Sequence, residues 1–236
     1  MGSRQLLQIL PTNQTIAYSF RGGVPQIVFE IPKCPKIMNG RSLRINGTLN
    51  VYLGNGTTPP TRPSNAYQTD ADLNDGSGAQ IDCRSGISSL FDYVEIKNLN
   101  GQTYEQNKNY NRMAQALMPT DNALTSYLCG GVDATYGAAG KNKNQGRMCD
   151  RPLSFSVPLL SGLLQGSRGL DLMLMQGLVI TLQLQSPENA LQNSFWHSIQ
   201  TDETAVTILG AGPYYELTDM LLTVEVEVPD AAGRQA

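Results

Sequence analysis

The stretch SSLFDYVEIKNLNGQ, residues 88–102, decides how the whole sequence is interpreted. Val94 and Ile96 alternate with polar residues, and this period of two predicts a strand with one buried face. The pair Asn100-Gly101 that follows is a strong signal for a tight turn. No catalytic motif lies in the stretch, so it indicates architecture rather than chemistry.

A short helix is expected soon after this turn, over residues 110–117. Its apolar residues have the spacing of one helical face, and they are Tyr110, Met113, Ala114 and Leu117. We interpret this face as core packing, and Pro119 ends the helix. A second short helix is expected from Asp121 to Leu128, closed by Gly130-Gly131.

Alternation of apolar and polar residues predicts strands on both sides of this stretch. The expected strands are 15–20, 27–31, 43–53, 153–157, 170–175, 178–185 and 217–228, in addition to the one around Val94. In 43–53, the longest clean alternation, Leu43, Ile45 and Leu49 face one way while Arg44 and Asn46 face the other. One face of each sheet is therefore buried and one is wet, as in antiparallel sandwiches. These strands predict an all-β fold, an eight-stranded antiparallel jelly-roll β-sandwich with short helical insertions.

Composition agrees with a loop-rich β-protein. The chain has 236 residues, enough for one large all-β domain, with 23 Gly and 13 Pro. Charged residues make up 16% and the net charge is −3, which argues against a specific nucleic-acid partner because phosphate binding needs clustered Lys and Arg. No apolar run is long enough to form a transmembrane segment, and no signal core follows Met1, so we expect synthesis and assembly inside a cell.

Four cysteines, Cys34, Cys83, Cys129 and Cys149, contain no CxxC pair. Their spacing fits neither a zinc knuckle nor a redox motif, so free, packed thiols are expected.

Candidate catalytic residues are few. The single histidine, His197, follows Phe195-Trp196 and has no second imidazole and no nucleophile motif near it, so a packing or interface role is expected. Glu225 and Glu227 lie two apart on one strand face, which favours a solvated or partner-facing edge over a catalytic pair. We predict no catalytic residue and no enzyme activity.

Candidate binding motifs are equally weak. Asp70, Asp72 and Asp75 resemble part of a calcium loop, but their spacing departs from the EF-hand and no Glu closes it. The run 137–141 lacks phosphate-loop spacing, and the basic loop 141–147 carries only three charges. We therefore predict no cofactor and no metal.

Several segments resemble the first jelly roll of double-jelly-roll major capsid proteins, found in virophages, polinton-like viruses and related eukaryotic DNA viruses. The segments that carry the resemblance are 90–98 with Asn100-Gly101, 109–113, 151–159 with Leu163-Leu164, and 215–222. It covers most of residues 14–230. It rests on pattern and order, and two such barrels need roughly twice this length. The chain is thus either one barrel of a longer protein or a single jelly roll.

The resemblance implies a structural capsid protein that self-assembles into an icosahedral shell and is located in the virion. Its partners would be other copies of itself, in a homotrimer, and neighbouring capsid proteins. We expect a jelly-roll domain at 14–229 between an extension, 1–13, and a tail or linker, 230–236. Loops 54–86, 131–150 and 186–213 are the expected contact surfaces.

Two other functions stay open at this point. A jelly roll can be a carbohydrate-binding, lectin-like module, because a fold does not determine function. A hydrolase on a β-sandwich is a weaker alternative, with His197 as its best candidate residue.

Overall fold

The computed structural model describes residues 3–20, 23–52, 79–81, 86–117, 153–166, 169–193 and 214–229. The strands are β1 (Ser3–Ile9), β2 (Gln26–Ile31), β3 (Ile37–Met38), β4 (Arg44–Tyr52), β5 (Ala79–Ile81), β6 (Phe91–Lys97), β7 (Thr103–Lys108), β8 (Leu153–Pro158), β9 (Leu170–Asp171), β10 (Leu178–Leu184), β11 (Leu191–Asn193) and β12 (Tyr214–Val228). The helices are α2 (Tyr110–Leu117) and α4 (Pro187–Ala190), with 3-10 turns η1 (Gly40–Ser42) and η2 (Gly86–Leu90).

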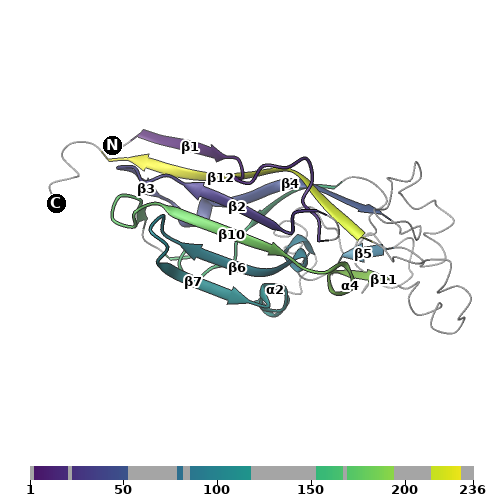
Figure 1. The fold of residues 1–236 in the computed structure, drawn as a ribbon. Helices are drawn as coiled ribbons and strands as arrows, with labels where there is room; N and C mark the ends of the chain where they lie inside the picture. The colour runs from purple at the N-terminus through teal and green to yellow at the C-terminus, as the bar shows by residue number, and fades with distance from the viewer. Residues whose placement is uncertain are drawn as a thin grey trace, which may run out of the picture.

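Two antiparallel sheets form the body of the molecule (Figure 1). We call sheet A the one in which β1, β12, β4 and β8 are neighbours, extended by the short β3 and β9, and sheet B the one in the order β2-β10-β6-β7. The pairings nest: β1 with β12, β2 with β10, β4 with β8, and β6 with β7. One long hairpin rolled into two layers produces this order, so the predicted eight-stranded jelly-roll sandwich is confirmed.

The core lies between the two sheets and comes from the alternation seen in the sequence. In β2, Ile27, Phe29 and Ile31 are fully buried, while Glu30 is exposed. Central strand β10 is buried along nearly its whole length, because it has β2 on one side and β6 on the other. The expected inward faces of β4, β6, β8 and β12 are also buried, as shown by Leu43, Ile45, Leu49, Val94, Ile96, Phe155, Val157, Val224 and Val226.

A bulge in β12 accounts for one glycine of β4. The register between the two strands shifts between Thr218 and Leu221, and Asp219 has a φ of 54°. A Cβ on Gly47 would lie 2.6 Å from the sulfur of Met220 and 2.9 Å from the ring of Phe155. Because Gly47 has no Cβ, the side chain of Met220 can occupy the space beside it, next to the bulge.

The first predicted strand, 15–20, was wrong. Ile16 is 92% exposed, and within this segment Tyr18 forms only isolated bridges. The edge strand beside β12 is instead β1, which lies in the segment expected to be an N-terminal extension. As an edge strand β1 buries little, so its sequence SRQLLQI has no clean alternation. The domain boundaries at 14 and 229 stay predictions.

The predicted strand 170–175 was also wrong beyond its first two residues. β9 ends at Asp171, whose Oδ1 accepts hydrogen bonds from the backbone N–H groups of Met173 (2.8 Å) and Leu174 (3.2 Å). An aspartate that bonds its own backbone in this way forms a turn and competes with a strand. Leu174 consequently lies 79% exposed at the turn.

β7 was missed, because its sequence TYEQNK has no apolar alternation. The turn before it was predicted correctly: Gly101 N–H donates to the carbonyl of Asn98 (3.0 Å), and Gly101 has a φ of 89°. After β7, α2 has the predicted bounds, with Tyr110 and Ala114 buried. Leu117 is 64% exposed, so its expected place in the core was wrong.

The predictions on the cysteines and on the second helix fall only partly on residues that the structure describes. Cys34 is a free, half-buried thiol, and the other three cysteines lie outside the described residues, as does the second helix expected at 121–128. Among the helices of the described part of the chain, none is long and apolar enough to span a bilayer.

Candidate assembly surfaces

The candidate chemical residues do not come together into a site. His197 with Trp196, the aspartates at 70–75 and the basic loop 141–147 lie outside the described residues. Glu225 and Glu227 are exposed on the outer face of β12, where their cross-strand neighbours on β1 are Leu6 and Arg4. Within the described ranges no group of three His, Cys, Asp or Glu side chains could hold a metal ion.

The three segments expected to make contacts, 54–86, 131–150 and 186–213, lie mostly outside the described residues. The described parts are β5, η2 at Gly86, α4 and β11, and β5 pairs with β11 over three residues. Two segments expected to be loops are thus joined by a small sheet of their own. That these segments contact other subunits stays a prediction.

The strand ends next to these segments lie at one end of the sandwich (Figure 1). Tyr52, the last residue of β4, pairs with Tyr214, the first of β12. Leu153, the first of β8, pairs with Leu49. Nearby, the buried hydroxyl of Tyr215 lies 2.6 Å from the carbonyl of Gln185, to which it donates a hydrogen bond, and burial raises the pKa of Tyr215.

The sandwich has two lateral edges, and one of them is sealed by side chains. We call the closed edge the side formed by β7, β8, α2 and the turn 159–164. There the Glu105 carboxylate of β7 accepts hydrogen bonds from the Ser161 hydroxyl (2.5 Å) and from the backbone N–H groups of Gly162 (3.1 Å) and Leu163 (3.0 Å). A carboxylate held by several donors is a strong, charge-assisted link between two elements.

The surroundings of Glu105 favour its ionised form. Burial alone would raise the pKa of this carboxyl, but the hydrogen bonds from Ser161, Leu163, Asn107 and Gly162 outweigh burial and hold the pKa below its usual range. The polar sequence of β7 thus has a structural use: its inward glutamate fastens this strand to the turn after β8.

Tyr110 closes the same edge from the helix. Its ring is buried and its hydroxyl accepts a hydrogen bond from the backbone N–H of Leu160 (2.8 Å). Burial raises the pKa of Tyr110 despite this bond and a second one with Ser88. The helix predicted from the sequence therefore connects η2, where Ser88 lies, with the turn that Glu105 also binds.

The opposite edge, which we call the arm edge, consists of β1, β2 and residues 10–18. Beyond β1 the chain crosses from sheet A to sheet B: Thr12 N–H donates to the carbonyl of Val28 (2.7 Å). The side chain amide of Asn13 forms the hydrogen bonds that the backbone of a neighbouring strand would form. Its Nδ2 donates to the Gln26 carbonyl (2.7 Å), and its Oδ1 accepts from the N–H of Val28 (3.1 Å). The exposed edge of β2 is thereby paired without another strand.

At Tyr18 the chain returns to sheet A. Tyr18 and Leu217 exchange two backbone hydrogen bonds of 2.9 Å, and the buried Tyr18 ring packs in the core. The Tyr18 hydroxyl donates to the carbonyl of Asn13 (3.1 Å), which fixes the crossing between the two sheets. Residues 10–18 therefore cover the edge of β2 in sheet B, while β1 forms the outer edge of sheet A.

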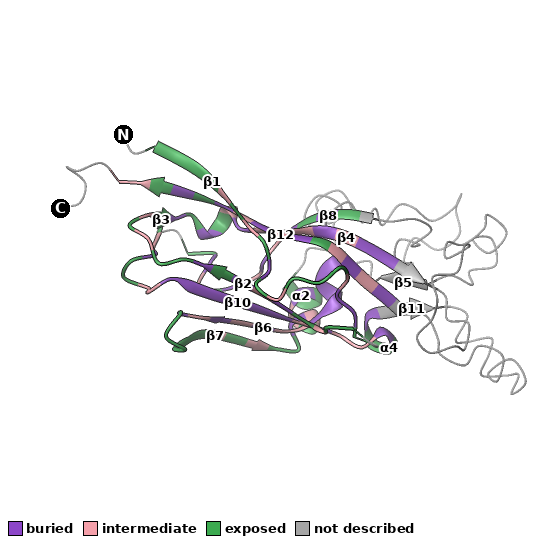
Figure 2. Cartoon of the chain, turned by 45° about the horizontal axis from the view of Figure 1, so that its top comes forward, coloured by how far each residue is buried: buried purple, intermediate pink, exposed green. Residues whose placement is uncertain are grey.

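The arm edge differs from the closed edge in its surface. Of eleven exposed large apolar side chains in the described residues, five belong to positions 6–24, namely Leu6, Leu10, Ile16, Phe20 and Val24. Over the described residues 3–20 and 23–31 the only charged side chains are Arg4 and Glu30. An apolar, charge-poor surface is typical of protein contacts. β1 lies outermost here and is exposed along most of its length (Figure 2).

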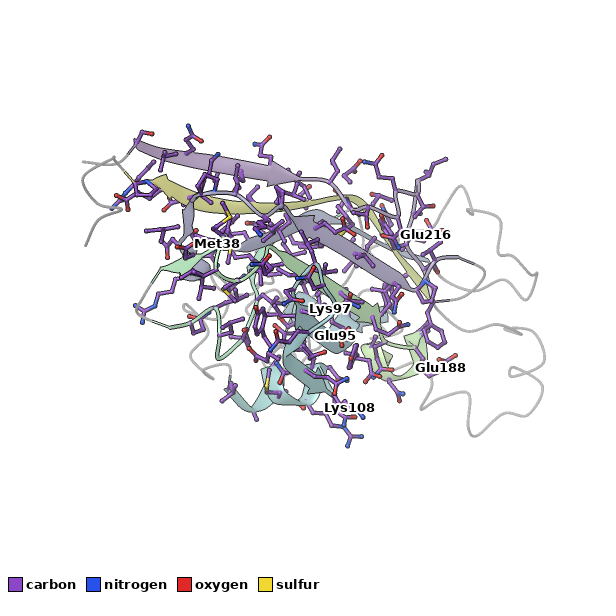
Figure 3. The ribbon with its side chains drawn as sticks, turned by 60° about the vertical axis from the view of Figure 1, so that its left-hand side comes forward. Met38, Glu95, Lys97, Lys108, Glu188 and Glu216 are labelled. Carbon is purple, nitrogen blue, oxygen red and sulfur yellow. The ribbon has the colours of Figure 1, made fainter. Side chains whose placement is uncertain are left out.

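The outer face of sheet B is different again, because two of its charged side chains, Lys97 and Glu95, form an ion pair on that face. Lys97 Nζ lies 3.6 Å from Glu95 Oε2, and the Thr103 hydroxyl donates to Glu95 Oε1 (3.4 Å). Glu95, Lys97 and Lys108 lie on the neighbouring strands β6 and β7 (Figure 3). Exposed ion pairs contribute little to stability and keep a face solvated. Sheet B is therefore a weaker contact candidate than the arm edge.

The sequence matches no protein-family model and no curated protein. Similar solved structures are the Faustovirus major capsid protein (TM-score 0.56, 9% identity, 100% of this chain and 56% of that chain) and the crystal structure of the mavirus major capsid protein (0.51, 12%, 97% and 48%). The cryo-EM structure of the Sputnik virophage is another (0.52, 12%, 98% and 49%). The chain spans about half the length of these structures. The resemblance to double-jelly-roll capsid proteins is confirmed as a likeness of fold.

Proposed function

We propose that this chain is a structural subunit of a viral capsid. The observation that supports this most is the likeness of the whole chain, up to 100% of its length, to part of major capsid proteins. The jelly-roll β-sandwich that the sequence pattern predicts is also the fold of this chain, and the likeness to these structures supports the same fold. A fold alone does not determine function, so the proposal also draws on the charge-poor, apolar arm edge as a surface for assembly.

The proposed role is non-enzymatic. A shell subunit acts through contacts and needs no reacting group, cofactor or metal. Its partners would be further copies of the chain and neighbouring capsid proteins, with a trimer as the expected unit, and its location would be the virion. Nothing in the described part of the chain favours the carbohydrate-binding alternative, and a glycan array would test that alternative directly.

Assembly can be measured on the purified full chain. Sedimentation velocity over a wide range of concentration, combined with negative-stain electron microscopy, should show oligomers that grow with concentration into capsomers or shell pieces. Buried interfaces with few charges should depend little on salt. A chain that stays strictly monomeric at high concentration, with its native fold shown by circular dichroism, would contradict the proposal.

A further inference from the structure

The backbone of β1 is open on one side. In the residues that the structure describes, β1 pairs with β12 alone, from Ser3 opposite Val228 to Ile9 opposite Leu222. Its other side presents a row of backbone N–H and C=O groups. Such a row is a ready template for another strand.

The usual protections of an edge strand are missing from β1. It is seven residues long, its register with β12 has no bulge, and it contains no proline. Its only charge is Arg4 at one end, whereas edge strands commonly carry several charges. Leu6, at its centre, is 59% exposed. An edge of this kind is expected to pair rather than to remain in water.

The charge of the surface indicates which partner fits. A two-fold contact places each residue of a strand opposite a residue of its own copy, so like charges there would repel. β1 avoids this because Arg4 is its only charged side chain, and in the described rest of the arm edge only Glu30 of β2 is charged. β1 offers an acidic partner only Arg4, and the acidic side chains Glu225 and Glu227 lie one strand away on β12, whereas a second copy of this chain can pair along β1 without opposing like charges.

We propose that β1 pairs antiparallel with β1 of a second copy, around a two-fold axis at Leu6, so that sheet A continues from one copy to the other. This proposal rests on the proposed function, because it names a contact through which subunits associate. In this register Leu6 lies opposite Leu6 of the copy and Arg4 lies opposite Gln8. The two exposed leucines are then buried together, and no like charges lie opposite each other.

Leu6→Asp tests the contact, with Leu174→Asp as the matched control. Both leucines are exposed in the monomer, but Leu174 lies in the turn after β9. Leu6→Asp places two carboxylates opposite each other across the contact and one opposite Glu225 within each copy, so in a variant whose native fold is shown by circular dichroism, dimer association measured by sedimentation velocity should weaken roughly tenfold or more. Leu174→Asp should associate like the wild type. Equal association of Leu6→Asp and the wild type would overturn the proposal.

A cysteine variant tests the register. Under mild oxidation Leu6→Cys should form a disulfide between copies, identified as a 6–6 linked peptide by mass spectrometry, while Leu174→Cys should not. If copies assemble into larger particles but neither the 6–6 link nor the Leu6→Asp defect is seen, the β1 contact is wrong and the capsid proposal stands. If the wild type does not associate at all, both proposals fail.

Discussion

The two lateral edges of the sandwich both have strands with unpaired backbone on one side, and they protect this backbone in different ways. Both end in strands that pair on one side only, β7 and β8 at the closed edge, β1 and β2 at the arm edge. The closed edge is fastened from within by Glu105 and Tyr110, which bond the turn 159–164. The arm edge is covered by backbone pairing and by one amide, Asn13, and it leaves apolar side chains outside. The closed edge therefore stabilises the fold, whereas the arm edge exposes the apolar side chains that the proposed contact would bury.

The largest effect is expected at the closed edge. Tyr110→Ala should lower the free energy of unfolding by about 3–5 kcal/mol, because it empties a buried ring site and leaves the N–H of Leu160 without its partner. Chemical denaturation measures this. The control is Leu117→Ala on the exposed side of the same helix, which should change stability by less than about 0.5 kcal/mol. A similar loss of unfolding free energy in both variants would contradict the conclusion that Tyr110 is a core residue and Leu117 is not.

A smaller effect is expected for Glu105→Gln, about 1–2 kcal/mol at neutral pH, since the carboxylate is partly exposed and its bonds are partly screened. The folded-state pKa of Glu105 lies below its unfolded value. Its contribution is therefore fully present above the unfolded pKa and is lost as pH falls through the folded pKa. Unfolding curves of wild type and variant should converge in acid. A difference that persisted undiminished there would rule out ionisation as its source.

At the arm edge, Asn13→Ala should lower the free energy of unfolding by about 1 kcal/mol, because two hydrogen bonds to β2 are lost but the site remains partly open to water. Hydrogen exchange gives the sharper measurement. The amide of Val28, which donates to Asn13, should lose protection, while amides in β10 should keep theirs. If protection fell equally across both sheets, residues 10–18 would unfold together with the whole domain rather than in a local opening.

The smallest effect on stability is expected for Leu6→Ala, within about 0.5 kcal/mol, because this side chain is already exposed. Its effect on association should nevertheless exceed that of any closed-edge variant that folds. Thermal unfolding at low concentration and sedimentation at high concentration separate the two quantities. A loss of stability without a loss of association would reverse the roles assigned to the edges.

The strands that could be predicted from the sequence are those with neighbours on both sides or with a fully buried inner face. In β2, Ile27 and Phe29 alternate with less buried residues and the pattern is clear. β1 and β7 escaped prediction because an edge strand buries little, and the inward residue of β7 is a glutamate. Asp171 could have been recognised as a turn former, since its short polar side chain competes with strand hydrogen bonds.

The contact candidates were predicted less well. The sequence analysis places the contacts with other subunits at the long segments 54–86, 131–150 and 186–213, because loops commonly carry function. The arm edge was missed, since Leu6, Leu10 and Ile16 are apolar and their pattern alone does not tell an exposed residue from a buried one. One available signal was the near absence of charge over residues 3–29.

The all-β class, the inward faces of the central strands and the helix over 110–117 can be predicted from the amino-acid sequence, because alternation and helical spacing are local consequences of burial. The pairing of β1 with β12, the hydrogen bonds of Asn13 along the edge of β2 and the binding of Glu105 to the turn after β8 become visible in the folded molecule alone. Backbone hydrogen bonds are alike in every strand, so the choice of partner depends on which faces must meet and where the chain has to close.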